Sequence, residues 1–395
     1  LNVWTKHLEA SAKRPVVVFI YGGAFQVGKN SFPTGAGDRF MEQEDMVYVS
    51  VNYRVGVMGF LELGDRYGGR FRGSGNCGMW DLLTALRWVD QNIESFGGDR
   101  NRIILMGISA GSKAIGALLT LPEVQKLCRR IIIESGAMQA FRTPETAMAV
   151  TRDYQKYLPS GCDLLDAPAE TLVEAQAEFC ACEGSTCFFG PVLESPFSAG
   201  WREQWNAGAC FRGKAIIGSG YHELVGLTQK EGFLERAEQV AFDLFGKNGA
   251  LAAEKQKELV REGTDPLEGW ERVFSDFMYR FYSDHFAKTL EQEGNDIWVY
   301  SFDYPPARHG QGFFFLQGQV EMPGEELAEE KVAEARKISD FFRARVREFI
   351  LNDEPDPNLW PRYQGGNKMV FDVNSHMQYR PSDTLEGFPE RVFCR

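Results

Sequence analysis

The chain has 395 residues, of which 44% are hydrophobic and 13% aromatic, and this is enough apolar sequence for a large buried core. Its formal net charge of -12 argues against a nucleic acid as the main partner, because phosphate backbones are bound by basic surfaces. No apolar run reaches the length that crosses a bilayer, so we expect no membrane span.

The first residues, 1–6, lack the basic and apolar regions of a signal peptide, and the chain does not begin with Met. We therefore expect that sequence upstream of Leu1 is missing, with a targeting segment as one candidate. The cellular location, cytoplasmic or secreted, stays open.

Eight cysteines are present, and three of them cluster as Cys180, Cys182 and Cys187. This spacing matches no recognised zinc pattern, and no histidine lies close by in sequence. The sequence favours a reduced or disulfide-linked loop over a metal site, so no metal is expected.

Strand-like runs alternate with helix-like stretches, which predicts an α/β fold with a mostly parallel central sheet covered by helices on both faces. We interpret residues 1–395 as a single catalytic domain. The expected strands are 15–21, 46–53, 102–106, 130–134, 215–218 and 297–302. The expected helices are 79–96, 110–121, 275–290 and 325–351, with a less distinct helical region over 143–211.

The most specific motif is Gly107-Ile108-Ser109-Ala110-Gly111, a G-x-S-x-G pentapeptide between an apolar strand and a helix. This context is typical of a nucleophile elbow, in which a serine sits on a sharp turn and its crowded neighbours must be small. The pattern predicts Ser109 as a nucleophile, which then needs a base and amide donors for the oxyanion.

A second glycine-rich segment, Gly22-Gly23-Ala24-Phe25, follows the first apolar strand. Small residues there let the backbone approach a substrate closely. Together with the elbow downstream, the segment predicts an oxyanion hole formed by the amides of Gly23, Ala24 and Ala110.

Several blocks make the sequence resemble the type-B carboxylesterase family, which includes cholinesterases and some fungal lipases. These blocks are LNVW at 1–4, VVFIYGGAFQVG at 17–28, SVNYRVGVMGFL at 50–61, GNCGMWDLLTALRWVDQNIESFGG at 75–98, and 99–111 leading into the elbow. Weaker similarity continues at 189–192 and 360–361.

The resemblance implies an α/β-hydrolase fold, a Ser-Glu-His triad and hydrolysis of small-molecule carboxylic esters without a cofactor. Residues 216–223 are similar to the family's acid segment, which points to Glu223. Residues 300–304 and 307–310 are similar to its histidine segment, which points to His309.

The residues themselves support this choice less sharply. Among the five histidines, His309 lies in a loop after a strand, where the catalytic histidine of this fold belongs. Most glutamates are solvated surface groups, so Asp276 and Asp303 stay as alternatives to Glu223. The other histidines are His7, His222, His285 and His376.

The chain departs from the family pattern at several positions. Ile108 replaces a Glu that shapes the pocket of cholinesterases, so a choline-ester specialist is not expected. Ala24 replaces a third glycine, Leu224 a glycine after the acid, and Gly312 a Glu after the histidine. Members of the family carry a further segment before LNVW, which this sequence lacks. We therefore leave open that the chain is a fragment of a longer protein.

Phenylalanines near the expected site provide a candidate acyl pocket, with core packing as the alternative for each: Phe188, Phe189, Phe313, Phe314 and Phe315. We expect an uncharged ester with a short to medium acyl chain. Two rival functions remain, a non-catalytic adhesion protein such as those of the neuroligin branch and an inactive truncated hydrolase. The presence of Ser109 with a candidate base and acid speaks against the adhesion protein.

Overall fold

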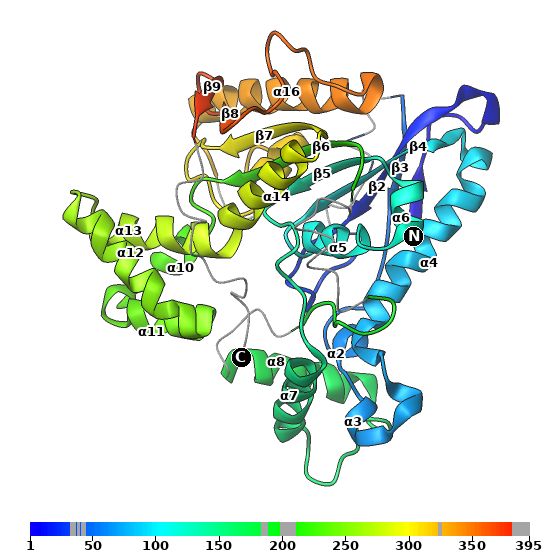
Figure 1. Cartoon of the computed structure of the whole chain (residues 1–395), viewed down its shortest axis with the longest axis vertical. Coiled ribbons are helices and arrows are strands. Elements are labelled where there is room, and N and C mark those ends of the chain that lie inside the picture. Colours follow the sequence, from blue (N-terminus) through cyan, green and yellow to red (C-terminus); the bar gives the residue numbers. More distant parts are fainter. Residues whose placement is uncertain are drawn as a thin grey trace.

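The computed structural model describes residues 1–31, 37, 40, 45–182, 189–197, 211–322 and 326–380. A nine-stranded sheet runs through these residues in the order β1-β3-β2-β4-β5-β6-β7-β8-β9 (Figure 1). The strands are β1 (Asn2–Trp4), β2 (Arg14–Ile20), β3 (Val47–Ser50), β4 (Gly98–Ile108), β5 (Arg130–Glu134), β6 (Lys214–Gly220), β7 (Asp296–Phe302), β8 (Asn367–Phe371) and β9 (His376–Tyr379).

The seven strands from β3 to β8 in this order pair in parallel, and the edge strands β1 and β9 pair antiparallel to their neighbours. Every residue of β2 and β5 is buried. A strand buried on both faces needs a layer of helices on each side of the sheet, and parallel connections supply those helices. The predicted mostly parallel α/β architecture is confirmed.

Helices cover both faces of the sheet. In Figure 1, α16 (Glu329–Asn352) lies along one face, and α4 (Cys77–Asn92), α5 (Ala110–Leu118) and α14 (Phe281–Gln292) lie on the other. The rings of Trp298 and Tyr300 on β7 contact Phe349 and Phe342 of α16. These aromatic contacts fix α16 against the sheet.

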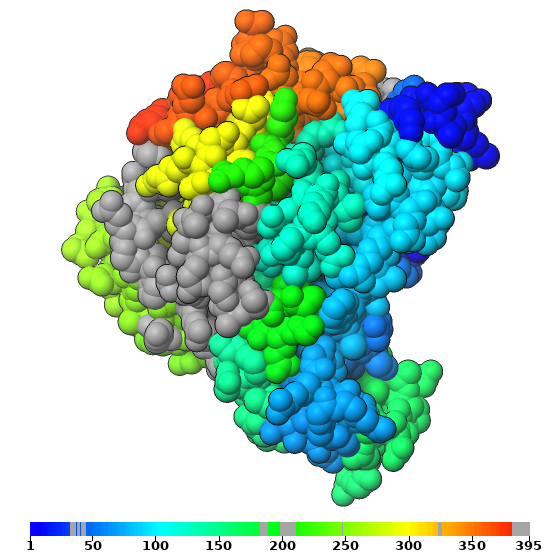
Figure 2. Space-filling model, turned by 45° about the vertical axis from the view of Figure 1, so that its right-hand side comes forward, coloured from blue at the N-terminus to red at the C-terminus, as the bar shows by residue number. Residues whose placement is uncertain are grey.

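Two further groups of helices follow the C-terminal ends of strands. After β5 come α7 (Pro144–Tyr154) and α8 (Ala169–Cys182), and after β6 come α10 (Val225–Thr228), α11 (Phe233–Phe245), α12 (Gly249–Arg261) and α13 (Pro266–Ser275). Figure 1 shows them as two separate lobes on the same side of the sheet. In Figure 2, α7 and α8 lie at the end of the molecule opposite α16, beside α2 (Val57–Phe60) and α3 (Gly64–Tyr67).

The remaining helices are short: α6 (Pro122–Leu127), α15 (Gln311–Leu316), the single turns η1 (Ala10–Ala12), η2 (Gly69–Phe71), η3 (Ser74–Asn76), η4 (Ile93–Phe96), η5 (Gln155–Tyr157) and η6 (Gly246–Asn248), and the π-helical turn η7 (Asp276–Arg280). The expected helix over 275–290 is thus η7 followed by α14. The expected helix over 110–121 ends earlier, at Leu118.

All six expected strands are present, but the sequence analysis missed β1, β8 and β9. These strands are three to five residues long, and β1 and β9 have no fully buried residue. It also missed α11 to α13, whose own apolar cluster includes Phe233, Phe245 and Trp270. The single-domain interpretation of residues 1–395 stays a prediction.

Within the described ranges, no helix combines the length and apolarity needed to span a bilayer. The same part of the chain holds no group of three or more His, Cys, Asp or Glu side chains placed to bind a metal. Cys180 is a free thiol. The side chain of Cys182 and the whole of Cys187 lie outside the described residues, so the expected cysteine loop is not tested.

Candidate active site

Ser109 occupies a sharp turn between β4 and α5. Its backbone has φ 55° and ψ -121°, a conformation that an L-residue adopts only when its surroundings force it. The Ser109 amide donates to the carbonyl of Glu134 on the neighbouring strand at 2.8 Å, and the Ser109 carbonyl accepts from the Lys113 amide at 3.0 Å. These two bonds hold the turn from both sides.

The glycines of the pentapeptide are needed because the turn presses against the sheet. A Cβ atom on Gly111 would overlap the carbonyl oxygen of Ile20, and one on Gly107 would lie 2.8 Å from the carbonyl carbon of Gly111. The structure therefore gives a steric reason for both glycines, as a nucleophile elbow requires.

The loop after β2 lies directly beside this turn. A Cβ atom on Gly22 would lie 3.0 Å from the Cβ of Ser109. Gly23, Ala24 and Phe25 all have positive φ, and the Gly23 carbonyl accepts from the amides of Gln26 and Val27. Within the described residues, the amides of Gly23 and Ala24 donate no hydrogen bond, so both remain available to a ligand. Ala110 is the first residue of α5, where amides lack helical partners.

His309 is paired with Glu223. The Nδ1 atom of His309 lies 2.5 Å from Oε2 of Glu223, and the His309 amide donates to the Glu223 carbonyl at 3.2 Å. Both residues follow strands that end at the same edge of the sheet, Glu223 after β6 and His309 after β7. Ser109 follows β4 at that same edge. The loops of Ser109 and His309 lie close together, because a Cβ atom on Gly310 would lie 3.2 Å from Cδ1 of Ile108, the residue before Ser109.

The other oxygen of Glu223 is held by two donors that the sequence analysis did not identify. Oε1 accepts from the hydroxyl of Ser135 at 2.5 Å and from the amide of Gly220 at 2.7 Å. Because these bonds fix one carboxylate oxygen, the other points at the imidazole. Ser135 follows β5 with φ 55°, and this strained position could only be found from coordinates.

The alternative acids and bases have other partners. Asp276 pairs with Arg280 at 2.6 Å, and Asp303 pairs with Arg380 at 2.7 Å. His222 lies 3.6 Å from Glu271, and burial lowers its pKa. His376, the first residue of the exposed strand β9, lies 3.7 Å from Asp372. The structure therefore favours Glu223 over both aspartates as the partner of His309.

The face of the His309 ring is covered by Tyr279. The two ring centroids lie 4.5 Å apart with an interplanar angle of 24°, a stacked arrangement. Tyr279 belongs to η7, and π-helical turns are frequent at functional sites. Lys113 of α5 places its Nζ atom 5.0 Å from the centroid of the Tyr279 ring. The stack fixes the plane of the imidazole.

Backbone strain is concentrated in the loops that form this site. Five of the eight non-glycine residues with positive φ in the described ranges lie in these loops: Ala24, Phe25, Ser109, Ser135 and Ala307. Strain of this kind persists only where the surrounding structure enforces it, and it clusters at active sites.

Of the described phenylalanines proposed as a pocket, Phe189, Phe313 and Phe315 are buried and Phe314 is half-buried. Phe189 is 4% exposed and Phe313 is 1% exposed, and the Phe313 ring stacks on Phe19 of β2 at 5.0 Å. Packing in the core accounts for the position of Phe313. Core packing was the alternative to an acyl pocket that the sequence analysis gave for each of these phenylalanines. Phe188 lies outside the described residues.

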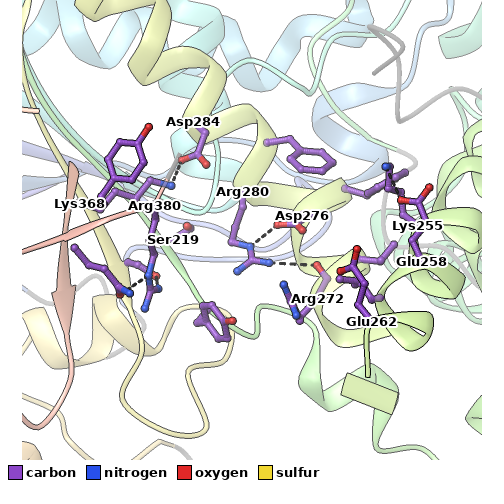
Figure 3. Close-up of a pocket in the computed structure, with 18 residues that line it drawn as sticks. Ser219, Lys255, Glu258, Glu262, Arg272, Asp276, Arg280, Asp284, Lys368 and Arg380 are labelled. Atoms are coloured by element: carbon purple, nitrogen blue, oxygen red, sulfur yellow. Dashed lines mark hydrogen bonds and ion pairs between the residues drawn. The ribbon is translucent and has the colours of Figure 1, made fainter. Parts of the chain in front are cut away.

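A separate pocket of about 700 Å³ opens beside the loop after β6 that carries Glu223, between α12, α13 and the end of the sheet (Figure 3). Its lining is rich in charge, and most of the charged groups neutralise one another, as in the pairs of Arg280 with Asp276 and Lys368 with Asp284. None of Ser109, Glu223 and His309 lines it. It is therefore distinct from the candidate active site.

The sequence is similar to those of known carboxylesterases. Residues 1–387 match the model of the carboxylesterase family. The para-nitrobenzyl esterase of Bacillus subtilis (strain 168) is 28% identical over 410 aligned positions, which cover 96% of this chain and 78% of that protein. The acetylcholinesterase of Gallus gallus is 43% identical over 137 residues, 35% of this chain and 17% of that protein.

Solved structures show the same fold. The carboxylesterase of Geobacillus stearothermophilus superimposes with a TM-score of 0.83 at 29% identity, covering 96% of this chain and 82% of that one. A PNB esterase superimposes with a TM-score of 0.78 at 25% identity, covering 95% and 81%. The chain therefore has the α/β-hydrolase fold and belongs to the carboxylesterase family of carboxylic-ester hydrolases.

Proposed function

We propose that the chain hydrolyses uncharged carboxylic esters in two steps through an acyl-enzyme on Ser109, with His309 as general base and Glu223 as the acid that orients it. The observation that carries this proposal is the 2.5 Å contact between His309 Nδ1 and Glu223 Oε2, at the sheet edge where Ser109 occupies a nucleophile elbow. The family membership supports the reaction type.

In the first step, the Ser109 hydroxyl attacks the ester carbonyl while Nε2 of His309 takes its proton. Glu223 holds Nδ1–H and stabilises the imidazolium that forms. The proton then passes to the leaving alcohol, and an acyl-serine ester remains. In the second step, water gives its proton to His309 and attacks this ester, which releases the acid and restores the serine.

Negative charge develops on the carbonyl oxygen in both steps. The amides of Gly23, Ala24 and Ala110 are our proposed donors to this oxyanion. The free amides of the loop after β2, and its contact with Ser109 through Gly22, support this role. Loss of one such donor typically costs about 10²–10³ in turnover.

The substrate is an uncharged ester with a short to medium acyl chain. Ile108, beside the nucleophile, presents an apolar side chain rather than a carboxylate, which supports an uncharged rather than a cationic substrate. A profile of kcat/KM for p-nitrophenyl esters of increasing acyl length would identify the preferred acid.

Fluorophosphonate labelling and hydrolysis of p-nitrophenyl acetate and butyrate test the mechanism. We expect the wild-type protein to be labelled and active, and Ser109→Ala to lose both properties. Ser283→Ala, a change at a buried serine of α14, is the matched control and should retain both. Labelling that persists in Ser109→Ala would refute the nucleophile. A folded wild type with neither property would favour an adhesion protein or an inactive hydrolase.

A further inference from the structure

Two consecutive residues at the end of β5 contact the loops of all three proposed triad residues. The Glu134 carbonyl accepts from the Ser109 amide at 2.8 Å, and the Ser135 hydroxyl donates to Glu223 Oε1 at 2.5 Å. The Glu134 side chain reaches the third loop, because its Oε1 accepts from the Phe313 amide at 3.1 Å, four residues after His309. The Glu134 carboxyl group itself has no role in the mechanism described above.

This carboxyl group is held in a buried site. Glu134 is 2% exposed, and its Oε2 lies 2.6 Å from the hydroxyl oxygen of Tyr300 on β7, a hydrogen bond in which a protonated carboxyl group is the donor. Both carboxyl oxygens therefore have hydrogen-bond partners, one on β7, two strands away from β5 in the sheet, and one at the start of α15. The Phe313 bond ties the helix that follows His309 to the rigid centre of the sheet.

Gly312 makes the space for this carboxyl group. A Cβ atom at position 312 would lie 2.8 Å from Oε2 of Glu134, closer than real side chains approach. Any larger residue at position 312 would have to displace either the carboxyl group or the start of α15. The glycine and the buried glutamate thus form a matched pair.

Glu134 and Glu223 are two carboxyl groups in one buried region, and water cannot screen their charges there. Burial and, to a lesser extent, the charge of Glu223 raise the pKa of Glu134 to about 8, against the opposing effect of the bonds from Tyr300 and the Phe313 amide. The titratable groups that face Glu134 are Tyr300 from β7 and Glu223 from the loop after β6.

We propose that Glu134 is a positioning residue for His309: through the Phe313 amide it fixes the segment that carries the imidazole, and it keeps its own proton, so that it adds no negative charge near Glu223. This inference rests on the proposed function. A second negative charge at this place would oppose ionisation of Glu223, and Glu223 must be charged to stabilise the imidazolium.

Kinetics of two substitutions test the positioning role. Glu134→Gln is neutral, nearly isosteric and able to accept from the Phe313 amide, so we expect its kcat to stay within about threefold of the wild-type value at pH 7. Glu134→Ala removes the tie, and we expect kcat to fall on the order of tenfold to 100-fold with little change in KM. Glu62→Gln, a change at another buried glutamate, is the control and should keep the wild-type kcat.

A double-mutant cycle tests the contact with Gly312. Gly312→Ala should lower kcat in the wild-type background and have little further effect in Glu134→Ala, because the group that it displaces is gone. Equal losses in both backgrounds would contradict the pairing of Gly312 with Glu134.

The pH dependence of stability tests the proton on Glu134 without using activity. In the folded wild type, Glu134 keeps its proton up to a pKa of about 8, whereas in the unfolded chain it loses the proton above its ordinary pKa of 4.5. The folding stability of the wild type therefore falls as pH rises from 4.5 toward 8. Glu134→Gln lacks this loss, and its Tm relative to the wild type should therefore rise between pH 5 and pH 8. A Tm difference that is constant over this range would overturn the proposed protonation.

The outcomes separate the two proposals. A labelled and active wild type together with an unchanged kcat in Glu134→Ala overturns only the positioning role. A wild type that fluorophosphonate does not label overturns the proposed function and the positioning role with it, and the Tm comparison still decides whether Glu134 holds a proton.

Discussion

The carboxylate of Glu223 contacts the imidazole of His309, and the two side chains differ in how deeply they are buried. The Glu223 side chain is fully buried, and the His309 side chain is 30% exposed. A buried carboxylate interacts strongly with its partner because water does not screen it. Part of the imidazole is exposed, as its proposed role as the base requires, and the carboxylate that contacts it is buried.

We expect Glu223→Gln to lower kcat by about 10³–10⁴, because an amide neither selects the imidazole tautomer nor stabilises its cation. Steady-state hydrolysis of p-nitrophenyl acetate measures this change, and circular dichroism checks the fold. Glu271→Gln removes the carboxylate beside His222, 3.6 Å away, and should leave kcat unchanged. A kcat within tenfold of the wild-type value in Glu223→Gln would exclude Glu223 as the orienting acid.

Gly111→Ala should destabilise the fold by about 3 kcal/mol or more, because the added methyl group overlaps the carbonyl oxygen of Ile20 in a buried strand. Urea unfolding measures the free energy. Gly226→Ala on α10 is the control, since no atom lies within 4 Å of the place that its added methyl group would occupy. The control should change stability by no more than about 1 kcal/mol, in the favourable direction. Similar losses in both variants would contradict the steric explanation.

Tyr279→Ala should lower kcat by about tenfold with a smaller effect on KM, because the imidazole loses the ring stacked on it at 4.5 Å. Tyr279→Phe retains the ring and should keep most of the activity. If the phenylalanine and alanine variants lose activity equally, the hydroxyl of Tyr279 rather than its ring face matters.

Acid should destabilise the protein partly through His285 on α14. Burial, and secondarily the charge of Lys288, lowers the pKa of His285 below its ordinary value of 6.5. As pH falls below 6.5, His285 therefore binds a proton in the unfolded chain before it does so in the folded protein. Folding stability is lost in that range. His285→Gln should flatten the fall of Tm between pH 7 and pH 5. The exposed-site variant His7→Gln should keep the wild-type slope, and an unchanged slope in His285→Gln would rule out this contribution.

The parts of the site that the sequence predicted are those with local causes. The elbow at Ser109 is encoded within five residues, because the turn itself excludes side chains at positions 107 and 111. The long buried strands were equally clear, since continuous apolar runs such as β2 have few alternatives in a folded chain.

The partner of His309 could not be chosen from local sequence. Asp276, Asp303 and Glu223 are all acids near the expected site, and chain order and family resemblance favoured Glu223 without excluding the others. Folding separates them: Arg280 and Arg380 pair with the two aspartates, and the imidazole pairs with Glu223. Ser135 and Tyr279 were missed for the same reason, because their contacts join segments far apart in the chain.

The sequence by itself determined the nucleophile turn, the parallel strands and the family, because each depends on neighbouring residues or on continuous blocks of similarity. Only the tertiary structure decided which carboxylate contacts the imidazole, which ring covers it and that Glu134 is buried against Tyr300 and the Phe313 amide. The physical reason is that these contacts depend on how separate strands end at one edge of the sheet, where short distances and exclusion of water determine the strength of each interaction.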